Sequence, residues 1–323
     1  MCALAAADAG WHVDIYDAGE ATRASEVAGG MLGTLGEGHP GEEGLFALSA
    51  ESTAWWPGWI ERLGDPAIVT AADTLFVATT AADGEYLRQL AQFVWAQQVP
   101  DGRLTGLRGR QVRAHEPSLS TRVHSGYRAL GEGALDNRRL LAGVRSRLAE
   151  RGGHVHRMWV DSFADVPGDQ VLIAAGMGTS ALLPDVKLVP AKGEILRLRR
   201  NRQSVPVPRN VIRARVEGRH VYLVPRADGL VVGATQYEPV SPDDRAAHAG
   251  GVADLLADAI AIMPGLRTYE LIEASAGIRP GSADGLPVVE RIDDRTLVAT
   301  GHGRNGIVLA PATAARIVEL LAG

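Results

Sequence analysis

Segments with the pattern of β-strands alternate along this chain with segments of helical pattern. Residues 11–16 and 171–175 have the composition of strands, whereas residues 137–151 and 307–321 carry apolar side chains at helical spacing. Such alternation is typical of α/β folds, in which helices connect the strands of a parallel sheet. Between about residues 187 and 233 the pattern changes to short strands separated by turns. We therefore predict an α/β domain interleaved with a smaller α+β domain built on an antiparallel sheet.

The turn-rich region contains four predicted strands, at residues 194–198, 211–216, 220–224 and 230–233. Further helices are predicted at residues 45–63, 85–98 and 243–263. Asp136 is expected to cap the helix that follows it, because its side chain can accept hydrogen bonds from the first backbone amides. No repeat or low-complexity linker separates the two patterns, so each domain is expected to consist of discontinuous segments.

Composition excludes several classes of protein. The 323 residues include 33 basic and 38 acidic side chains, a formal charge of −5, so a basic surface for nucleic acid is not expected. No apolar run approaches the roughly 18 residues that a membrane span needs. The single cysteine, Cys2, excludes an intrachain disulfide, and no export signal is visible. These features predict a cytoplasmic protein that binds neither membranes nor nucleic acid.

An acidic residue ends the first predicted strand, because Asp17 directly follows residues 13–16. In dinucleotide-binding units, an acid at the end of the second strand binds the ribose hydroxyls of the adenosine. The Gly-x-Gly-x-x-Gly turn that precedes such an acid is absent. Asp17 is therefore either a ribose ligand or an ordinary turn residue.

Three glycine-rich segments have the pattern of ligand-binding loops. Residues 25–33 contain Gly29 and Gly30, whose backbone amides can approach phosphate oxygens or a flat ring. Residues 176–178 directly follow a predicted buried strand, where α/β sheets bind ligands. Residues 301–306 precede an apolar helix, a position that suits an electron-rich ring oxygen or an anion. Together the three segments indicate a large cofactor.

Six short motifs occur in a fixed order along the chain. They are AGGMLG at 28–33, PAKGE at 190–194, YLVPR at 222–226, VVGAT at 231–235, AGIRPG at 276–281, and GHGRNG with LAPAT between 301 and 313. This set resembles the glycine oxidase family, which belongs to the FAD-dependent D-amino-acid oxidase superfamily and serves thiamine thiazole synthesis. The resemblance implies a Rossmann-like FAD-binding domain and a substrate domain. We assign residues 1–66, 132–190 and 276–323 to the first, and 67–131 and 191–275 to the second.

The matched motifs imply how the cofactor is held. Asp17 would take the ribose, Ser25 with residues 29–31 would line the pyrophosphate and ring, and the backbone of Val160 would meet the adenine. Residues 304–310 would hold the pyrimidine edge of the flavin, with the positive end of the last helix directed at it. The implied FAD contacts are Asp17, Ala18, Ser25, Gly29, Gly30, Met31, Val160, Gly176, His302, Gly303, Asn305, Gly306, Ile307, Val308 and Leu309.

The resemblance also implies a substrate site. Tyr222 and Arg279 are similar to the pair that holds the amino-acid carboxylate, and Arg304 to a further substrate contact. A guanidinium binds a carboxylate through two parallel hydrogen bonds, which orients the Cα–H bond over flavin N5. Considered singly, Arg279 could instead form a surface ion pair and Tyr222 could belong to the core. Gln236 stands where the family would have methionine, which leaves open how apolar the pocket is.

These residues imply an oxidase of glycine and small amines or D-amino acids that uses molecular oxygen. Its products would be a 2-oxo acid, ammonia and hydrogen peroxide. FAD is expected to be non-covalent, because Cys2 is far in sequence from the position where related oxidases tether flavin. No metal is expected, although His154 and His156 share a strand face. A homo-oligomer is expected, as the family forms tetramers.

Two other functions stay open at this stage. A dehydrogenase of amino or 2-hydroxy acids would pass electrons to a carrier instead of oxygen, and a chain without the glycine turn could be a non-catalytic remnant. Since Asp17 lacks that turn, we expect the biological chain to start upstream of Met1. The additional segment would be a central strand, the glycine turn and half a helix, roughly 12–18 residues.

Overall fold

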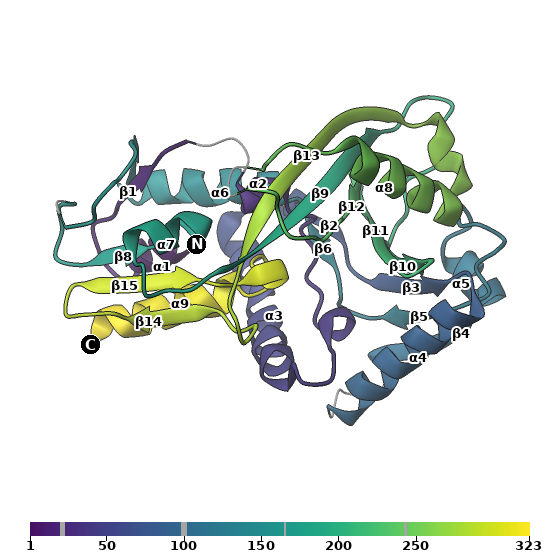
Figure 1. Ribbon diagram of the computed structural model, residues 1–323, viewed down its shortest axis with the longest axis horizontal. Helices are drawn as coiled ribbons and strands as arrows, with labels where there is room; N and C mark the ends of the chain where they lie inside the picture. The colour runs from purple at the N-terminus through teal and green to yellow at the C-terminus, as the bar shows by residue number, and fades with distance from the viewer. Residues whose placement is uncertain (20–22, 98–101, 165, 242–243) are drawn as a thin grey trace.

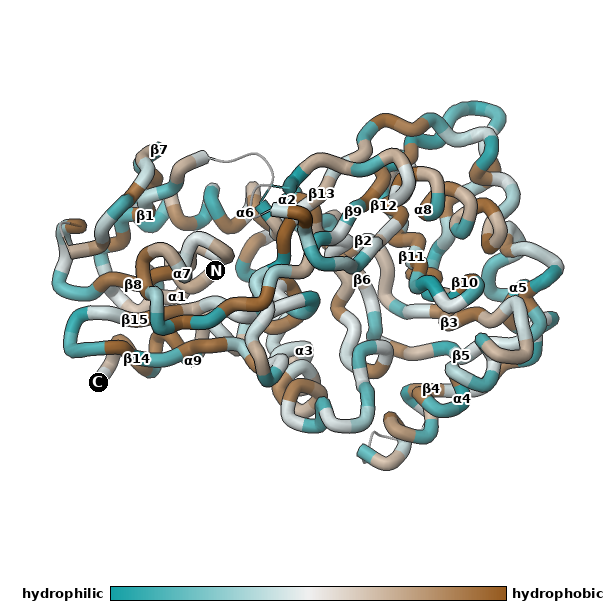
Figure 2. Tube along the Cα trace, viewed as in Figure 1, coloured by the Kyte–Doolittle hydropathy of each residue, from teal (hydrophilic) through white to brown (hydrophobic). Residues whose placement is uncertain are grey.

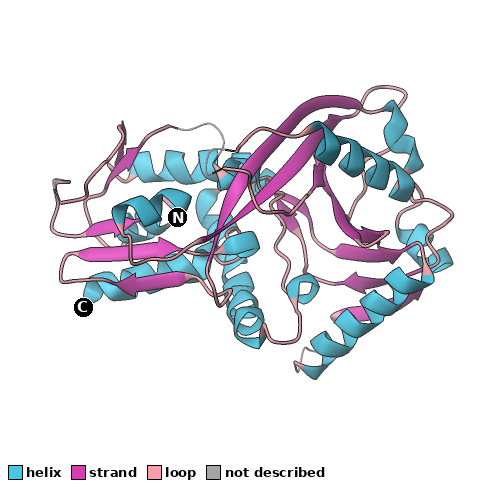
Figure 3. Ribbon diagram, in the orientation of Figure 1, coloured by secondary structure: helices cyan, strands magenta, loops and turns pink. Residues whose placement is uncertain are grey.

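The computed structural model describes residues 1–19, 23–97, 102–164, 166–241 and 244–323. Figure 1 shows two halves, one with both chain termini and one with a large sheet. Helices and strands occur in both halves, as Figure 3 shows, and each half is assembled from segments far apart in the sequence. This interleaved arrangement of helices and sheets confirms the predicted fold class. The domain boundaries stay a prediction.

Helices and strands alternate along the chain, as the sequence pattern predicts. The helices are α1 (Cys2–Asp8), α2 (Ala24–Val27), α3 (Glu43–Leu63), α4 (Ala81–Ala96), α5 (Gly109–His115), α6 (Asn137–Glu150), α7 (Thr179–Leu182), α8 (Ala249–Ile262) and α9 (Ala310–Ala322). The strands are β1 (Asp14–Asp17), β2 (Val69–Ala71), β3 (Thr74–Ala78), β4 (Leu104–Arg108), β5 (Ser125–Ala129), β6 (Ala134–Leu135), β7 (His154–Arg157), β8 (Val171–Ile173), β9 (Val189–Arg199), β10 (Val211–Val216), β11 (Arg219–Arg226), β12 (Gly229–Gly233), β13 (Glu270–Gly281), β14 (Val288–Arg291) and β15 (Thr296–Thr300). None of the described helices is long and apolar enough to cross a membrane.

The largest sheet has the strand order β13-β9-β12-β11-β10-β3-β5-β4. It contains the four strands predicted between residues 187 and 233, here β9 to β12. Its neighbouring strands are antiparallel except for β10 and β3, which run parallel. The sheet is therefore mixed and not purely antiparallel. Parallel neighbours need a long crossover, and here the chain between β3 and β10 passes through the other half before it returns.

The two longest strands, β9 and β13, pair antiparallel along their whole length. Their register runs from Val189 opposite Gly281 to Arg199 opposite Glu270. Figure 1 shows this pair extending from the large sheet toward the half with the termini. The sequence pattern predicts only part of β9 and no strand at β13, because the first residues of β13 are mostly exposed and lack alternation of apolar and polar side chains.

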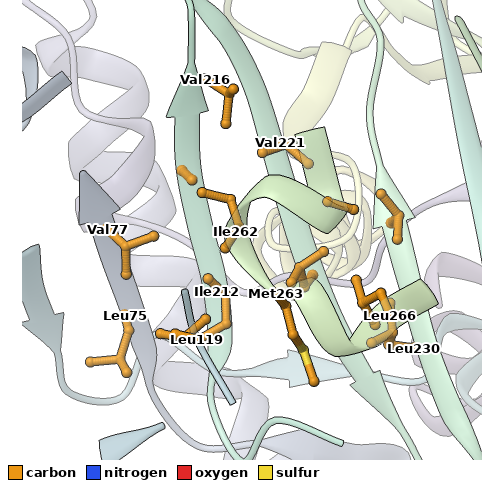
Figure 4. Close-up of a cluster of buried hydrophobic side chains, with 14 of the residues drawn as sticks. Leu75, Val77, Leu119, Ile212, Val216, Val221, Leu230, Ile262, Met263 and Leu266 are labelled. Carbon is orange, nitrogen blue, oxygen red and sulfur yellow. The ribbon is translucent and has the colours of Figure 1, made fainter. Parts of the chain in front are cut away.

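Helix α8 covers one face of the large sheet. Its last residue, Ile262, and the following Met263 are fully buried against Val216, Val221 and their neighbours (Figure 4). Complete burial of such side chains contributes about 2 kcal/mol each. In Figure 2 the strands beneath the helix contain many hydrophobic residues. The helix begins at Ala249 and not near residue 243, which lies outside the described residues.

The other half contains two small sheets, β14-β15-β8 and β1-β7. Helices α1, α3, α6 and α9 contribute to a buried cluster that includes Leu4, Trp56, Leu140 and Ala314. Strand β1 pairs parallel with β7, and β8 pairs parallel with β15. In the described chain, the second edge of β1 and of β8 has no strand partner, and a cavity lined by residues 11–18 and 166–178 separates them. The expected upstream strand stays a prediction.

The sequence signals predict one helix start correctly and another incorrectly. Asp136 caps α6 as predicted, because its Oδ1 accepts hydrogen bonds from the backbone N–H groups of Arg138 and Arg139 at 3.0 and 3.1 Å. The last helix, in contrast, begins at Ala310 and not at residue 307. A 3₁₀ turn at Gly303–Asn305 precedes it, and Pro311 occupies its first turn, where the missing N–H of proline costs nothing.

A buried carboxylate shapes the loop at residues 34–37. Glu132 is 1% exposed and accepts hydrogen bonds from the backbone N–H groups of Thr34 and Leu35 at 2.7 and 2.9 Å. A third backbone donor, Gly36, lies 3.3 Å from its other oxygen. Because three buried amides share one carboxylate, this side chain fixes the loop that carries Glu37.

We expect Glu132→Ala to lower the free energy of unfolding by about 3 kcal/mol, because it leaves buried amides without an acceptor. Denaturant unfolding followed by circular dichroism measures this loss. Glu290→Ala, which removes an exposed glutamate on β14, is the matched control. A loss no larger than that of the control would contradict the role of Glu132.

Candidate functional site

A cavity of about 1630 Å³ extends from β1 to the large sheet. Its walls come from both halves of the molecule. The sequence-predicted residues that line it are Asp17, Ala18, Ser25, Gly29, Gly30, Met31, Val160, Gly176, Tyr222, Arg279, Gly303, Arg304, Asn305, Gly306 and Ile307. The structure thus brings residues of the first, middle and last parts of the chain to one site.

One end of the cavity lies beside β1. Asp17 is the last residue of this strand, and its carboxylate accepts a hydrogen bond from the backbone N–H of Gly19 at 2.9 Å. The other carboxylate oxygen pairs with Arg23 at 2.7 Å. Val160 also lines the cavity, a short distance after β7. A carboxylate held at a strand end in this way fits the hydroxyl donors of a ribose.

The loop at residues 25–31 passes from this end toward the large sheet. Gly30 has φ of +77°, and a side chain at this position would collide with the carbonyl oxygen of Leu135. The carbonyl oxygens of Ser25 and Gly29 accept hydrogen bonds from Asn137 and Arg226 at 2.8 and 2.9 Å. These hydrogen bonds direct the carbonyl groups of Ser25 and Gly29 toward the protein. Because glycine has no side chain, Gly29 and Gly30 leave room in the cavity for a flat group.

Tyr222 lies on β11, and two glycines make room for its ring. A Cβ at Gly29 would lie 2.9 Å from the Tyr222 hydroxyl, and one at Gly233 would collide with the same group. Burial raises the pKa of Tyr222 above its ordinary value, against the opposing effect of Arg279 and other nearby arginines. The hydroxyl is therefore protonated at neutral pH and can donate a hydrogen bond into the cavity.

Arg279 approaches the cavity from β13. Its guanidinium occupies the space that a side chain at Gly193 would fill on the neighbouring strand β9. Its Nη1 is buried and has no hydrogen-bond partner, and no acidic side chain in the described chain pairs with it. A buried cation without a counter-ion is costly, so this geometry favours an anionic ligand.

Arg304 also lines the cavity, but acidic side chains already hold it. Its guanidinium lies 2.7 Å from Glu37 and 2.5 Å from Glu42. Glu37 in turn bridges to Arg213 at 2.6 Å. Burial by itself raises the pKa of Glu37, yet Arg213 and Arg304 outweigh burial and hold this pKa below its ordinary value. Glu37 is thus an anion shared by two arginines.

Three predicted cofactor contacts do not line the cavity in the described structure. Val308 and Leu309 lie in a buried cluster with Leu45, and the Val308 carbonyl oxygen accepts hydrogen bonds from Ser52 at 2.7 Å and Trp56 at 3.2 Å. We therefore do not propose side-chain contacts with FAD for these two residues. His302 is turned toward α9, where its Nε2 lies 2.8 Å from Thr313 Oγ1.

The sequence predictions do not include a buried ion cluster that flanks Gly193, a cavity-lining residue of β9. Lys192 is fully buried, and its Nζ lies 2.6 Å from Asp244 and 3.0 Å from His248 Nε2. Glu194, also fully buried, accepts hydrogen bonds from the Tyr237 hydroxyl at 2.6 Å and the His248 backbone N–H at 2.7 Å. The cluster ties the segment after β12 to β9. A lysine close to the strand predicted at 194–198, in a chain with two lysines, was the available signal.

The residues present fit FAD. Asp17 suits the ribose, the bare loop at Gly29 and Gly30 suits a flat or phosphate-bearing group, and the unpaired Arg279 marks the end at which an anionic substrate would bind. Among the described residues, no group of three or more His, Cys, Asp or Glu side chains could hold a metal ion.

Comparison with known proteins agrees with this assignment. A family model described as FAD dependent oxidoreductase (DAO) matches residues 1–320. A Rhizobium etli protein described as a thiamine biosynthesis oxidoreductase, ThiO, is 30% identical over 306 residues, which cover 92% of this chain and 85% of that protein. The glycine oxidase of Bacillus licheniformis is 28% identical over 349 residues, which cover 98% of this chain and 88% of that protein.

A solved structure has the same architecture. The crystal structure of glycine oxidase from Geobacillus kaustophilus matches with a TM-score of 0.86 and 27% identity, covering 99% of this chain and 90% of that chain. These similarities confirm the resemblance stated from the six motifs and the predicted cofactor. The chain belongs to the DAO family of FAD-dependent oxidoreductases.

Proposed function

We propose that the protein oxidises glycine and small amines or D-amino acids to a 2-oxo acid, ammonia and hydrogen peroxide. Molecular oxygen is the proposed acceptor, and thiamine thiazole synthesis is the proposed role. Relatives named glycine oxidase and thiamine biosynthesis oxidoreductase support this choice. A cytoplasmic location and a homo-oligomeric state stay predictions from the sequence.

The observation that carries the proposal is the unpaired guanidinium of Arg279. The carboxylate of an amino acid would supply its missing partner through two parallel hydrogen bonds. Tyr222, whose ring lies between Gly29 and Gly233, would donate a further hydrogen bond to the same carboxylate. Two contacts at one end of a small substrate fix the direction in which its Cα–H bond points.

Protein side chains are proposed to take little part in the redox step itself. Bound FAD would supply the hydride acceptor for the substrate Cα–H bond. The substrate amine must be unprotonated for this step, and no side-chain base is proposed. Burial lowers the pKa of His302 to about 4, so this imidazole is neutral at physiological pH and is held beside Thr313. In this proposal, protein groups orient the substrate, and Arg279 supplies a positive charge for its carboxylate.

The first test is the variant Arg279→Met. Loss of the partner of a buried carboxylate costs about 3–5 kcal/mol, so we expect the dissociation constant of glycine or a carboxylate inhibitor to rise by two or more orders of magnitude. Titration of the flavin absorbance without oxygen measures this change and shows that FAD stays bound. The variant Arg202→Met removes an exposed arginine and is the control. Unchanged glycine binding in Arg279→Met would refute the assignment.

The pH dependence of kcat/KM is expected to follow the substrate. The pKa of His302 is lowered to about 4 and that of Tyr222 is raised above its ordinary value, so neither side chain changes charge between about pH 6 and about pH 9. Activity should rise with pH as the free substrate ammonium loses its proton. The midpoint should therefore differ between two substrates of different amine pKa. A common midpoint for both substrates that disappears in His302→Asn would contradict this explanation.

The flavin is proposed to be non-covalent. Cys2 is the single cysteine of the chain, and burial raises the pKa of its thiol above the ordinary value. Raised thiol pKa values reduce the fraction of reactive thiolate. We expect acid precipitation to release all yellow colour as FAD, measured by absorbance of the supernatant. Colour that stays in the pellet would show a covalent link.

The electron acceptor is tested directly by oxygen uptake and hydrogen peroxide formation with glycine. Turnover with an artificial acceptor but not with oxygen would indicate a dehydrogenase. Protein that binds FAD but is not reduced by any amine would instead indicate a non-catalytic relative.

A further inference from the structure

Beyond Tyr222, the cavity continues along strands β10 and β11. In the antiparallel pair of β10 and β11, Arg213 lies opposite Tyr222 and Arg215 lies opposite His220. Residues two positions apart on a strand point to the same face, so these four side chains share one face of the sheet. All four line the cavity, as does Tyr86 from helix α4. The wall beyond the proposed glycine site is therefore polar and rich in arginine.

Arg215 is held in a fixed position in this wall. Its guanidinium lies over the ring of Tyr86, 4.7 Å from the centroid, and its Nε donates a hydrogen bond to the carbonyl oxygen of Gly218 at 3.0 Å. The ring of His220 contacts the edge of Tyr86, with centroids 5.6 Å apart. These contacts position the guanidinium but leave its charge uncompensated.

Two of the arginines that line the cavity have no acidic partner in the described chain. Arg213 and Arg304 share Glu37, and Arg304 also pairs with Glu42. Neither Arg215 nor Arg279 pairs with an acidic side chain of the described chain, although both line the same cavity. The pKa of His220 is lowered by burial and by Arg213 and Arg215, which agrees with a positive potential at this wall.

The strand order places the two unpaired arginines on opposite sides of Tyr222. The strands run β9-β12-β11-β10, with the Arg279 guanidinium beside Gly193 on β9 and Arg215 on β10. At the usual spacing between neighbouring strands, the backbones of β9 and β10 are about 14 Å apart. The side chains of Arg279 and Arg215 extend into this gap from either side, so their guanidinium groups are closer together than the backbones. Glycine, with one carboxylate, would engage only one of these cations.

We propose that Arg215 binds a second acidic group of the substrate, so that the preferred substrates are amines with two carboxylates. This inference rests on the proposed function, because Arg279 takes the first carboxylate. Tyr86 and His220 position the Arg215 guanidinium, and Arg215 itself determines specificity. The polar Gln236, which also lines the cavity, is consistent with a substrate larger and more polar than glycine.

The experiment compares dicarboxylic with monocarboxylic amines of similar structure. The pairs are iminodiacetate with sarcosine, and D-glutamate with D-alanine. We expect the wild-type protein to favour the dicarboxylic member, and Arg215→Gln to lower the ratio of kcat/KM within each pair at least tenfold. Arg215→Lys should restore part of the ratio, and Arg110→Gln, which removes an exposed arginine on α5, should leave it unchanged. An equal effect on both members would mean general attraction of anions and would overturn the proposal.

Binding without turnover separates this inference from the proposed function. Glutarate and acetate are the probes, and the flavin absorbance reports their binding. We expect glutarate to bind more tightly than acetate, Arg215→Gln to abolish the difference, and glutarate to raise the pKa of His220 measured by NMR. Equal binding of the two acids by the wild-type protein would overturn the proposal even if glycine is oxidised. Selective glutarate binding in a protein that oxidises no amine would support the acidic site while the proposed function fails.

Discussion

The pairing of β9 with β13 determines the geometry of the whole site. Gly193 on β9 leaves the space that the Arg279 guanidinium of β13 occupies, so the position of this guanidinium depends on the register of these strands. The same stretch of β9 carries Lys192 and Glu194, whose buried contacts hold the segment that contributes Gln236 to the cavity. A shift of one residue would turn every one of these side chains to the opposite face.

Charge sharing explains why arginines of the cavity have different roles. Glu37 neutralises Arg213 and contributes to the neutralisation of Arg304, and the Glu132 hydrogen bonds fix the loop on which Glu37 lies. Arg279 is left for a ligand because no acid of the described chain reaches it. A family pattern identifies an arginine, but the counter-ions around it decide whether it is available. Here Arg304 is engaged and Arg279 is not.

Much of this organisation could be predicted from the sequence. The strand that ends at Asp17, the helix cap at Asp136 and the turn-rich sheet all have local signals, and the structure contains each of them. β13 could not be predicted from periodicity because part of it is exposed, and the parallel pair of β10 and β3 depends on distant segments. The cluster at Lys192 depends on contacts across more than fifty residues. Such contacts arise from tertiary packing, which a single sequence does not reveal.

The β9–β13 pair also has a mechanical consequence. Gly277 of β13 packs against α2, and Gly281 forms a bridge with His302 beside the last helix, while the other end of the pair belongs to the large sheet. Neither half can melt without removing strands or packing surfaces from the other. Heating is therefore expected to disrupt both halves in one cooperative step.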